Sequence, residues 1–253
     1  AMLHFSLVDD IYQQDAYGSQ ILNQLERTRR FNAWMGDTLR PYIGDRVLEI
    51  GAGIGTLTEQ MIPRDAYMAS DINPVYLDYL RSYTIGKPYL RVRHIDAARP
   101  EHFDGLEQAF DTVMMVNVLE HVPDEAATLA NVFRVLEPGG QFVVLVPQHP
   151  ALYGTLDEAL EHRERYTRAG LWRSLETAGF AVNRVFDFNR ASVPGWWLNG
   201  RVLKKRTFSR FQLKVFDTAV PILRHVDRWL PYGGQSLIAV ATRPGAVGTP
   251  HQA

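Results

Sequence analysis

Glycines at every second position mark one short stretch of the chain as a ligand-binding turn. VLEIGAGIGTLTEQM (47–61) contains Gly51, Gly53 and Gly55, directly after an apolar run that carries Glu49. Glycine lets the backbone approach a ligand closely, and the helix expected next offers free N–H groups to a negative group. Asp71 follows Gly51 by 20 residues, where a carboxylate can accept hydrogen bonds from ribose hydroxyls. These features predict a nucleoside ligand without identifying it, because the third glycine comes one position too early for the dinucleotide fingerprint.

Side chains that could move a proton follow two further expected strands. His121 comes after the fourth strand, and His149, Tyr153 and His162 lie in the segment after the fifth. Ligands bind at the carboxyl edge of a parallel sheet, so His121 is a candidate base or acceptor-orienting group, although LEH could also simply cap a strand end. Spacings of four residues, as from His149 to Tyr153, predict shared helix faces in the later segment. We favour substrate contacts there over a metal held by Asp157 and the two histidines or an ordinary solvated helix, and predict no metal site.

A basic and aromatic segment lies between the last two expected strands. Residues 194–229 contain eight Lys or Arg and two Asp, whereas the whole chain has a net charge of −1. Large apolar side chains, including Trp196 and Trp197, are interleaved with the basic ones. The segment could be a solvated helical lid, a surface for anionic lipid or a phosphate-bearing substrate, or a site for single-stranded RNA. We favour the lid, place lipid second and disfavour nucleic acid.

An alternation of short apolar runs and amphipathic stretches must position these residues. Strands are predicted at 46–51, 66–72, 90–96, within 110–122, and at 141–147, 181–188 and 236–243. Helices are predicted at 56–62, 74–83, 124–136 and 167–180, after one or two amphipathic helices in 10–40. This order predicts a doubly wound α/β sheet. We expect an N-terminal helical cap (1–45), a core (46–188 and 236–244), a lid or substrate insert (189–235) and a disordered tail (245–253).

Composition narrows the class of protein. The chain of 253 residues is 46% hydrophobic, enough for a sizeable core, and its lack of cysteine excludes disulfides, thiolate metal sites and a cysteine nucleophile. No run of about 18 apolar residues predicts a membrane span, and the first residues lack the regions of a secretion signal. We expect a soluble, cytoplasmic protein whose membrane contact would be peripheral, through 194–229.

Five motifs in a fixed order narrow the ligand. E-x-G-x-G-x-G (49–55) is followed by SDIN (70–73), HIDAA (94–98), NVLEHV (117–122) and LEPGGQFVVLVP (136–147). This order resembles the class I S-adenosylmethionine-dependent methyltransferases. The resemblance implies a mostly parallel, seven-stranded Rossmann-like sheet whose last strand is antiparallel, with a helical insert before that strand.

The same resemblance implies a role for each matching residue, with S-adenosyl-L-methionine as cofactor and S-adenosyl-L-homocysteine as product. Asp71 would bind the ribose hydroxyls, and Ile72 would pack on the adenine. Asp96, with Ala97 beside it, would accept a hydrogen bond from the adenine amino group. The methionine part would be bordered by Glu49, Gly51, Ala52, Gly53, Gly55 and Asn117. The glycines would make room for it, and Glu49 would match its positive charge.

A narrower resemblance covers 148–243. HPALYGTLDEALEHRERY, VPGWWLNGRVL and GGQSLIAVATR are similar to methyltransferases encoded beside, or fused to, bacterial glycosyltransferases of the polyprenyl-phosphate-sugar type. It implies O-methylation of a glycan, a glycolipid or a lipid-linked, phosphate-bearing acceptor. The alternatives are a nucleotide-dependent (NAD-type) oxidoreductase, which the glycine spacing disfavours, and a non-catalytic module that binds S-adenosylmethionine.

Overall fold

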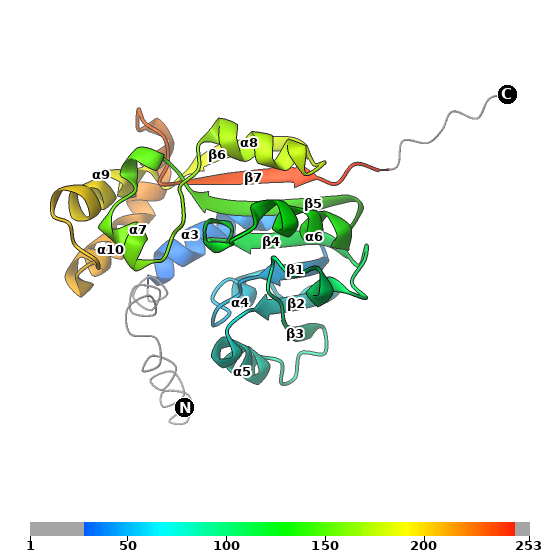
Figure 1. Ribbon diagram of the computed structural model, residues 1–253. Helices are drawn as coiled ribbons and strands as arrows, with labels where there is room; N and C mark the ends of the chain where they lie inside the picture. The colour runs from blue at the N-terminus through cyan, green and yellow to red at the C-terminus, as the bar shows by residue number, and fades with distance from the viewer. Residues whose placement is uncertain (1–27, 246–253) are drawn as a thin grey trace.

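The computed structural model describes residues 28–245 and contains one seven-stranded sheet (Figure 1). The strand order is β3-β2-β1-β4-β5-β7-β6. Five strands pair in parallel, and β7 runs antiparallel to both β5 and β6. The strands are β1 (Arg46–Ile50), β2 (Ala66–Asp71), β3 (Leu90–His94), β4 (Phe110–Val116), β5 (Leu136–Pro147), β6 (Ala181–Phe188) and β7 (Ser236–Thr242). The predicted doubly wound α/β sheet with an antiparallel last strand is confirmed.

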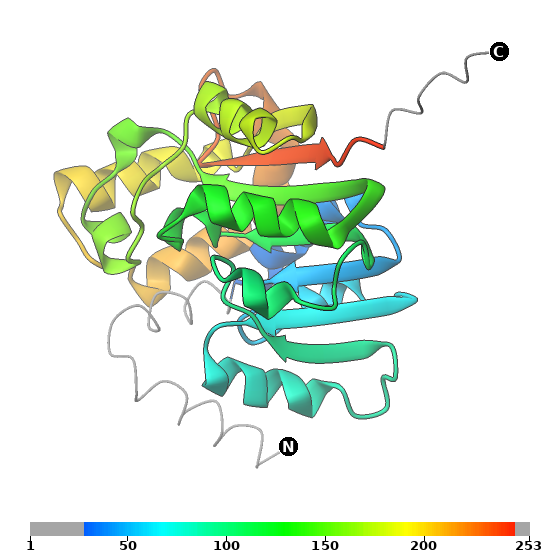
Figure 2. The same ribbon diagram turned by 45° about the vertical axis from the view of Figure 1, so that its right-hand side comes forward.

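Helices cover both faces of the sheet (Figures 1 and 2). The central strand β4 explains why: Val113 and Met115 pack with α6 and α8 on one face, whereas Met114 packs with α3 and α5 on the other. A strand buried on both faces reads as a continuous apolar run, as the sequence indicated. The helices are α3 (Arg29–Leu39), α4 (Thr58–Met61), α5 (Pro74–Tyr83), α6 (Glu125–Val135), α7 (Thr155–Ala159), α8 (Arg168–Thr177), α9 (Val193–Trp196) and α10 (Arg210–Val226).

Side-chain caps fix where several helices begin. Asn73 accepts a hydrogen bond from the backbone N–H of Val75 at the start of α5, and Asp124 accepts one from Ala127 at the start of α6. Short helical turns complete the chain; these are η1 (Arg40–Tyr42), η2 (Pro100–Phe103), η3 (Leu119–His121), η4 (Pro150–Leu152), η5 (Arg190–Ser192), the π-helical η6 (Trp197–Val202) and η7 (Asp227–Trp229).

The segment between β6 and β7 folds at the carboxyl end of the parallel strands. Between β6 and β7 the chain folds into η5, α9, η6, α10 and η7, which lie with α7 at the left of Figure 1. We call residues 189–235 the lid. It is tied to the start of the described chain because Asp217 of α10 accepts hydrogen bonds from the backbone N–H groups of Arg30 and Phe31 at the start of α3.

Three local predictions differ from the structure. The helix after the glycines is shorter than predicted, because α4 covers only Thr58–Met61. Strand β5 begins at Leu136 and not at residue 141, although its pairing with β4 is irregular between Leu136 and Gln141. The segment 147–167 contains only the short helix α7 and the helical turn η4, so the pairs spaced by four residues do not share a helix face. Predictions for 1–27 and 246–253, including most of the N-terminal cap and the tail, lie outside the described residues.

Among residues 28–245, no helix combines the length and the apolar character that crossing a membrane requires.

Candidate active site

The glycine loop between β1 and α4 is shaped by contacts within the protein. Gly51, Gly53 and Gly55 all have positive φ angles, of 76°, 55° and 84°, which favour glycine. A Cβ at Gly51 would lie 2.2 Å from Cγ2 of Val118, and one at Gly55 would lie 2.9 Å from Cδ2 of Leu80. The prediction gave this space to the cofactor; at these two glycines the protein's own side chains occupy it instead. The loop nevertheless presents its backbone at the carboxyl edge of the sheet.

Asp71 ends β2 beside this loop. Its Oδ2 accepts a hydrogen bond from the backbone N–H of Gly53 at 2.8 Å, and its Oδ1 accepts one from Asn73 at 2.8 Å. Burial raises the pKa of Asp71, although these N–H groups oppose the shift. A carboxylate oxygen can accept more than one hydrogen bond, so Asp71 retains acceptor capacity for ribose hydroxyls. The next side chain, Ile72, is apolar and 58% exposed, as a surface for a planar ring would be.

Glu49 lies beneath the loop and contacts other side chains. Its Oε2 accepts hydrogen bonds from the hydroxyls of Thr58 and Tyr67. Burial raises its pKa from 4.5 to about 7, and these hydroxyls only partly offset the shift. The carboxyl group therefore holds the loop's two flanks together, and its role toward the cofactor's positive charge stays a prediction.

The other predicted cofactor residues also reach the carboxyl edge, in different ways. Asp96 follows β3 and forms an ion pair with Arg99, with Nε and Oδ2 3.3 Å apart. Ala97 is buried in the core, and its carbonyl accepts a hydrogen bond from Asn131. Asn117 directly follows β4 and has a positive φ angle of 52° and an exposed side chain. Ala52 is buried, and its N–H donates to the carbonyl of Ser70.

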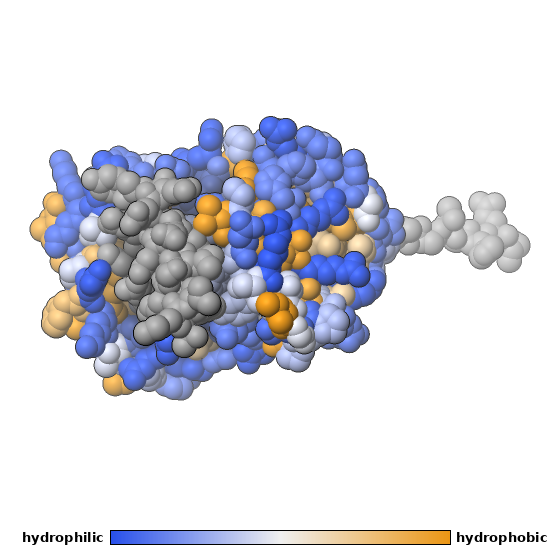
Figure 3. All heavy atoms as spheres, turned by 90° about the horizontal axis from the view of Figure 1, so that it is seen from below, coloured by the Kyte–Doolittle hydropathy of each residue, from blue (hydrophilic) through white to orange (hydrophobic). Residues whose placement is uncertain are grey.

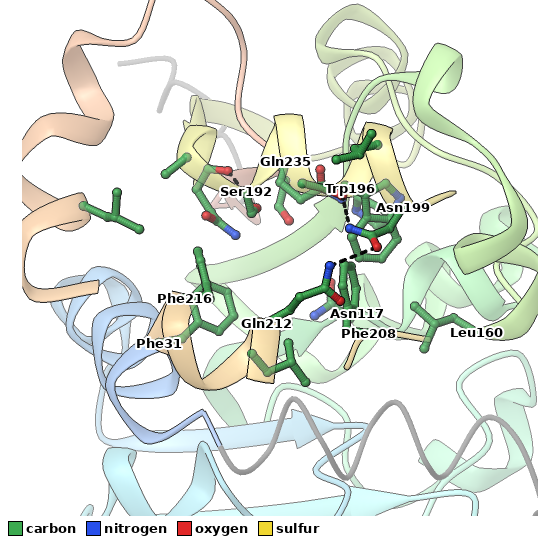
Figure 4. Close-up of a pocket in the computed structure, with 18 of the residues that line it drawn as sticks. Phe31, Asn117, Leu160, Ser192, Trp196, Asn199, Phe208, Gln212, Phe216 and Gln235 are labelled. Carbon is green, nitrogen blue, oxygen red and sulfur yellow. Dashed lines mark hydrogen bonds between the residues drawn. The ribbon is translucent and has the colours of Figure 1, made fainter. Parts of the chain in front are cut away.

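A cavity of about 570 Å³ opens beside Asn117 (Figure 4). The lid forms most of its wall, and α3 and the segment after β5 close its sides. Gln212 of α10 donates a hydrogen bond to Oδ1 of Asn199 in η6, which connects the two parts of the lid across the cavity. Most of the lining side chains are apolar, among them Phe31, Leu160, Trp196, Phe208, Leu213 and Phe216.

Two predicted catalytic histidines meet at the rim of this cavity. The rings of His121 and His162 lie 5.0 Å apart, and both side chains line the cavity. Although its side chain reaches solvent, desolvation and the neighbouring His162 lower the pKa of His121 to about 4. Nδ1 of His162 lies 2.8 Å from Oδ1 of Asp157, which also accepts a hydrogen bond from Arg165.

The two other predicted catalytic residues lie elsewhere. His149 has a positive φ angle of 65° and packs against Gly233, and Tyr153 donates a hydrogen bond to the backbone carbonyl of His162. Neither lines the cavity. The sequence reasoning missed Glu120, whose carboxyl group is buried beside His162 and whose pKa burial raises to about 8. It also missed Arg165, which lines the cavity; its burial carries no sequence signal, because Lys and Arg are ordinarily exposed.

Comparison with known proteins agrees with this geometry. Residues 48–142 match a family model described as a methyltransferase domain. The chain is 28% identical over 186 residues to a ubiquinone biosynthesis O-methyltransferase of Aeromonas salmonicida, covering 66% of this chain and 76% of that protein. It is 25% identical to a demethylmenaquinone methyltransferase of Symbiobacterium thermophilum, covering 56% of this chain and 60% of that protein. The chain spans only about half of other curated relatives, such as 48% of a Pseudomonas fluorescens ubiquinone biosynthesis O-methyltransferase.

Solved structures share the fold. A geranyl diphosphate methyltransferase in complex with its cofactor superposes with a TM-score of 0.61 at 14% identity, covering 84% of this chain and 85% of that one. The methyltransferase in a complex with the Haloferax volcanii Trm112 activator gives 0.62 at 17% identity, covering 92% and 100%.

The fold, the carboxyl-edge site and the domain match define this chain as an S-adenosylmethionine-dependent methyltransferase. The residues present fit that cofactor, because Asp71 has acceptor capacity for the ribose and the apolar Ile72 is exposed next to it. S-adenosylmethionine is therefore its methyl donor, and the acceptor has to be inferred from the cavity.

Proposed function

We propose that the enzyme methylates a hydroxyl group on an acceptor with a long apolar part, of the lipid-linked type. The observation that carries this proposal is the 570 Å³ cavity, which the apolar side chains of the lid line and which reaches Asn117 at the end of β4. Apolar pockets with a few polar groups bind ligands of matching character. Among the polar lining residues, His121 and His162 have rings 5.0 Å apart, and Arg165 shares the carboxylate of Asp157 with His162. We call the part of the cavity beside these three residues its polar end.

The shape of the cavity suits a methyl transfer whose rate depends on how the acceptor is positioned. S-adenosylmethionine supplies an electrophilic methyl group, and an acceptor oxygen must approach that methyl group in line with the bond that breaks. The lid would exclude water from this encounter and hold the apolar part of the acceptor against Phe31 and Phe216. Its hydroxyl would then lie at the polar end of the cavity, near His121. Two relatives support an acceptor of this kind by their names, since they act in ubiquinone biosynthesis and on demethylmenaquinone.

A labelling experiment tests the proposed acceptor class. The enzyme is incubated with methyl-labelled S-adenosylmethionine and either the organic-soluble or the aqueous fraction of a bacterial extract. We expect label in the organic fraction, in a product that carries the new methyl group as an ether and therefore resists mild base. Phe216→Ala, which removes a cavity wall, should lower this transfer at least tenfold. Ile85→Ala is the control, because Ile85 is 82% exposed and lies outside the lid. Label confined to water-soluble products, or equal loss in both variants, would refute the proposal.

We also propose that the outer surface of the lid docks on anionic lipid. Large apolar side chains of the lid that do not line the cavity are exposed, including Trp197, Leu203 and Trp229, at 51%, 50% and 73%. Figure 3 shows apolar and hydrophilic side chains interspersed at that end of the molecule, on the left. Lys204 and Lys205 are exposed, and in the described part of the chain neither forms an ion pair. Amphipathic aromatics favour the membrane interface, and basic residues are attracted to anionic lipid.

Vesicle sedimentation tests the docking surface independently of catalysis. Each basic residue near an anionic surface contributes about 1 kcal/mol, so Lys204→Gln with Lys205→Gln should weaken binding roughly thirtyfold at low salt. Arg91→Gln with Arg173→Gln is the control, because both arginines are exposed and lie outside the lid. Binding should need anionic lipid and fall with salt. No sedimentation with anionic vesicles at low salt, or equal weakening in the control, would overturn the proposal.

A further inference from the structure

The carboxyl group of Glu120 has no hydrogen-bond partner, although it is buried. The residue is 1% exposed, and neither Oε1 nor Oε2 accepts a hydrogen bond. Burying a charged or polar group without a partner is costly, so such groups in proteins normally have a partner or bind a metal ion. Glu120 follows β4 in η3, next to the proposed acceptor cavity. Arg165 and His162 lie near this carboxyl group, but neither forms a hydrogen bond to its oxygens.

His162 faces this carboxylate with one ring nitrogen. Nε2 of His162 lies 3.8 Å from Oε1 of Glu120, which is too long for a hydrogen bond. An ion bonded to both atoms at about 2.1 Å fits between them. The other nitrogen, Nδ1, lies 2.8 Å from Oδ1 of Asp157. A carboxylate on the far nitrogen fixes the ring and leaves the near nitrogen with its lone pair, as for histidines that bind metals.

Asp157 is itself held in place on both oxygens. Its Oδ1 also accepts a hydrogen bond from Nε of Arg165 at 2.7 Å, and its Oδ2 accepts one from the indole N–H of Trp196 at 3.3 Å. Arg165 and Asp157 form an ion pair, so Glu120 is the carboxylate of this cluster without a hydrogen-bonded partner. Asp157 therefore supports His162 in the way that a carboxylate supports a metal-binding histidine. None of the predicted cofactor contacts involves Asp157.

His121 completes the group from the solvent side. Its ring lies 5.0 Å from the ring of His162, and one ligand atom each of Glu120, His121 and His162 lies within 4.8 Å of the others. Two ligands of a tetrahedral ion are about 3.3 Å apart, so a small rotation of one ring closes the site. The ring of His121 can rotate in this way, because its side chain is exposed and its Nδ1 is held only by a 3.3 Å contact with the carbonyl of Glu161.

We propose that Glu120, His121 and His162 bind one divalent transition-metal ion at the polar end of the cavity. Two imidazoles and one carboxylate suit Zn²⁺, Mn²⁺ or Fe²⁺ better than Mg²⁺ or Ca²⁺, which prefer all-oxygen ligands. Three protein ligands leave positions open, as in catalytic sites. This proposal differs from the sequence analysis, which predicts no metal site.

The ion's role, unlike its binding, rests on the proposed function. Bound to an acceptor hydroxyl, it would favour loss of that proton to water and hold the oxygen in place. The oxygen lone pair then forms the bond to the methyl carbon, and the electrons of the breaking carbon–sulfur bond remain on sulfur. Charges balance, because the sulfonium becomes a neutral thioether as the proton leaves.

Calorimetry and cobalt spectroscopy test the binding without any acceptor. Tag-free, chelator-treated enzyme is titrated with Zn²⁺ and Mn²⁺, and Co²⁺ is added to record its visible ligand-field bands. We expect one ion per chain. Glu120→Gln, which keeps the shape and removes the charge, should weaken binding at least a hundredfold. Asp157→Asn, which leaves the three ligands in place and removes the charge that supports His162, should weaken it between tenfold and a hundredfold. His225→Gln is the control, because His225 is an exposed histidine on α10.

The outcomes separate this proposal from the proposed function. The proposal is overturned if none of the three ions binds the folded enzyme, or if Glu120→Gln and His225→Gln bind metal as tightly as the unaltered protein. Circular dichroism confirms that each variant is folded. Should metal bind as expected while the organic fraction still receives no label, the metal site stands and the acceptor class is wrong.

Discussion

Replacing Glu49 by Gln should change how stability depends on pH. In the folded protein burial raises the pKa of Glu49 from 4.5 to about 7. The folded state therefore keeps a proton that the unfolded state releases, and stability falls as pH rises from about 4.5 to about 7. The shift corresponds to about 3 kcal/mol above pH 7. Gln is always neutral, and its carbonyl oxygen can still accept the hydrogen bonds of Thr58 and Tyr67.

Denaturant unfolding at several pH values measures this effect. Other groups titrate in the same range, so the informative quantity is the difference in unfolding free energy between Glu49→Gln and the unaltered protein. We expect this difference to move in favour of the variant by up to about 3 kcal/mol between pH 4.5 and pH 8. A difference in packing alone would shift the unfolding free energy of the variant by the same amount at every pH. A difference that does not change with pH would refute the argument that Glu49 is ionised at a cost.

Three further predictions concern the loop and the lid. Asp71→Ala should weaken binding of S-adenosylhomocysteine more than about tenfold, or roughly 1.4 kcal/mol, and an unchanged dissociation constant in calorimetry would remove Asp71 from the site. Gly51→Ala should lower the unfolding free energy by about 2 kcal/mol or more, because its φ angle is 76° and its Cβ would meet Val118; equal denaturant midpoints would contradict this. Asp217→Ala should cost about 1 kcal/mol through loss of the cap on α3, and unchanged thermal unfolding would count against it.

The sheet could be predicted because its signals are local and strong. Buried strands such as β4 read as continuous apolar runs, and β6 and α5 begin and end at the predicted residues. The antiparallel last strand came from the resemblance, since periodicity does not give strand order. The segment after β5 was mispredicted because spacings of four residues do not require helical hydrogen bonds. There α7 ends at Ala159, and Glu161 has a positive φ angle of 59°, which ends helical geometry.

The active site was only partly predictable for a related reason. His121 and His162 were found because a histidine near a strand end is a recognisable signal, but their contact joins distant parts of the chain and depends on the turn at Glu161. Glu120 was passed over because burial of a carboxyl group is decided by packing, and its neighbours in sequence do not reveal it. The sequence shows which side chains could take part in chemistry. Which of them are buried without a hydrogen-bond partner depends on the fold.

The two halves of the site are built differently, and this has a functional consequence. The cofactor half consists of strand ends joined by short-range contacts, as between Asp71 and the N–H of Gly53. The half that we propose for the acceptor consists of the lid, held by long-range contacts such as that of Asp217 with α3. Changes in the lid can therefore alter the acceptor cavity without disturbing the glycine loop. On this basis Phe216→Ala should change acceptor use at constant cofactor affinity, whereas changes at Asp71 must affect every acceptor equally.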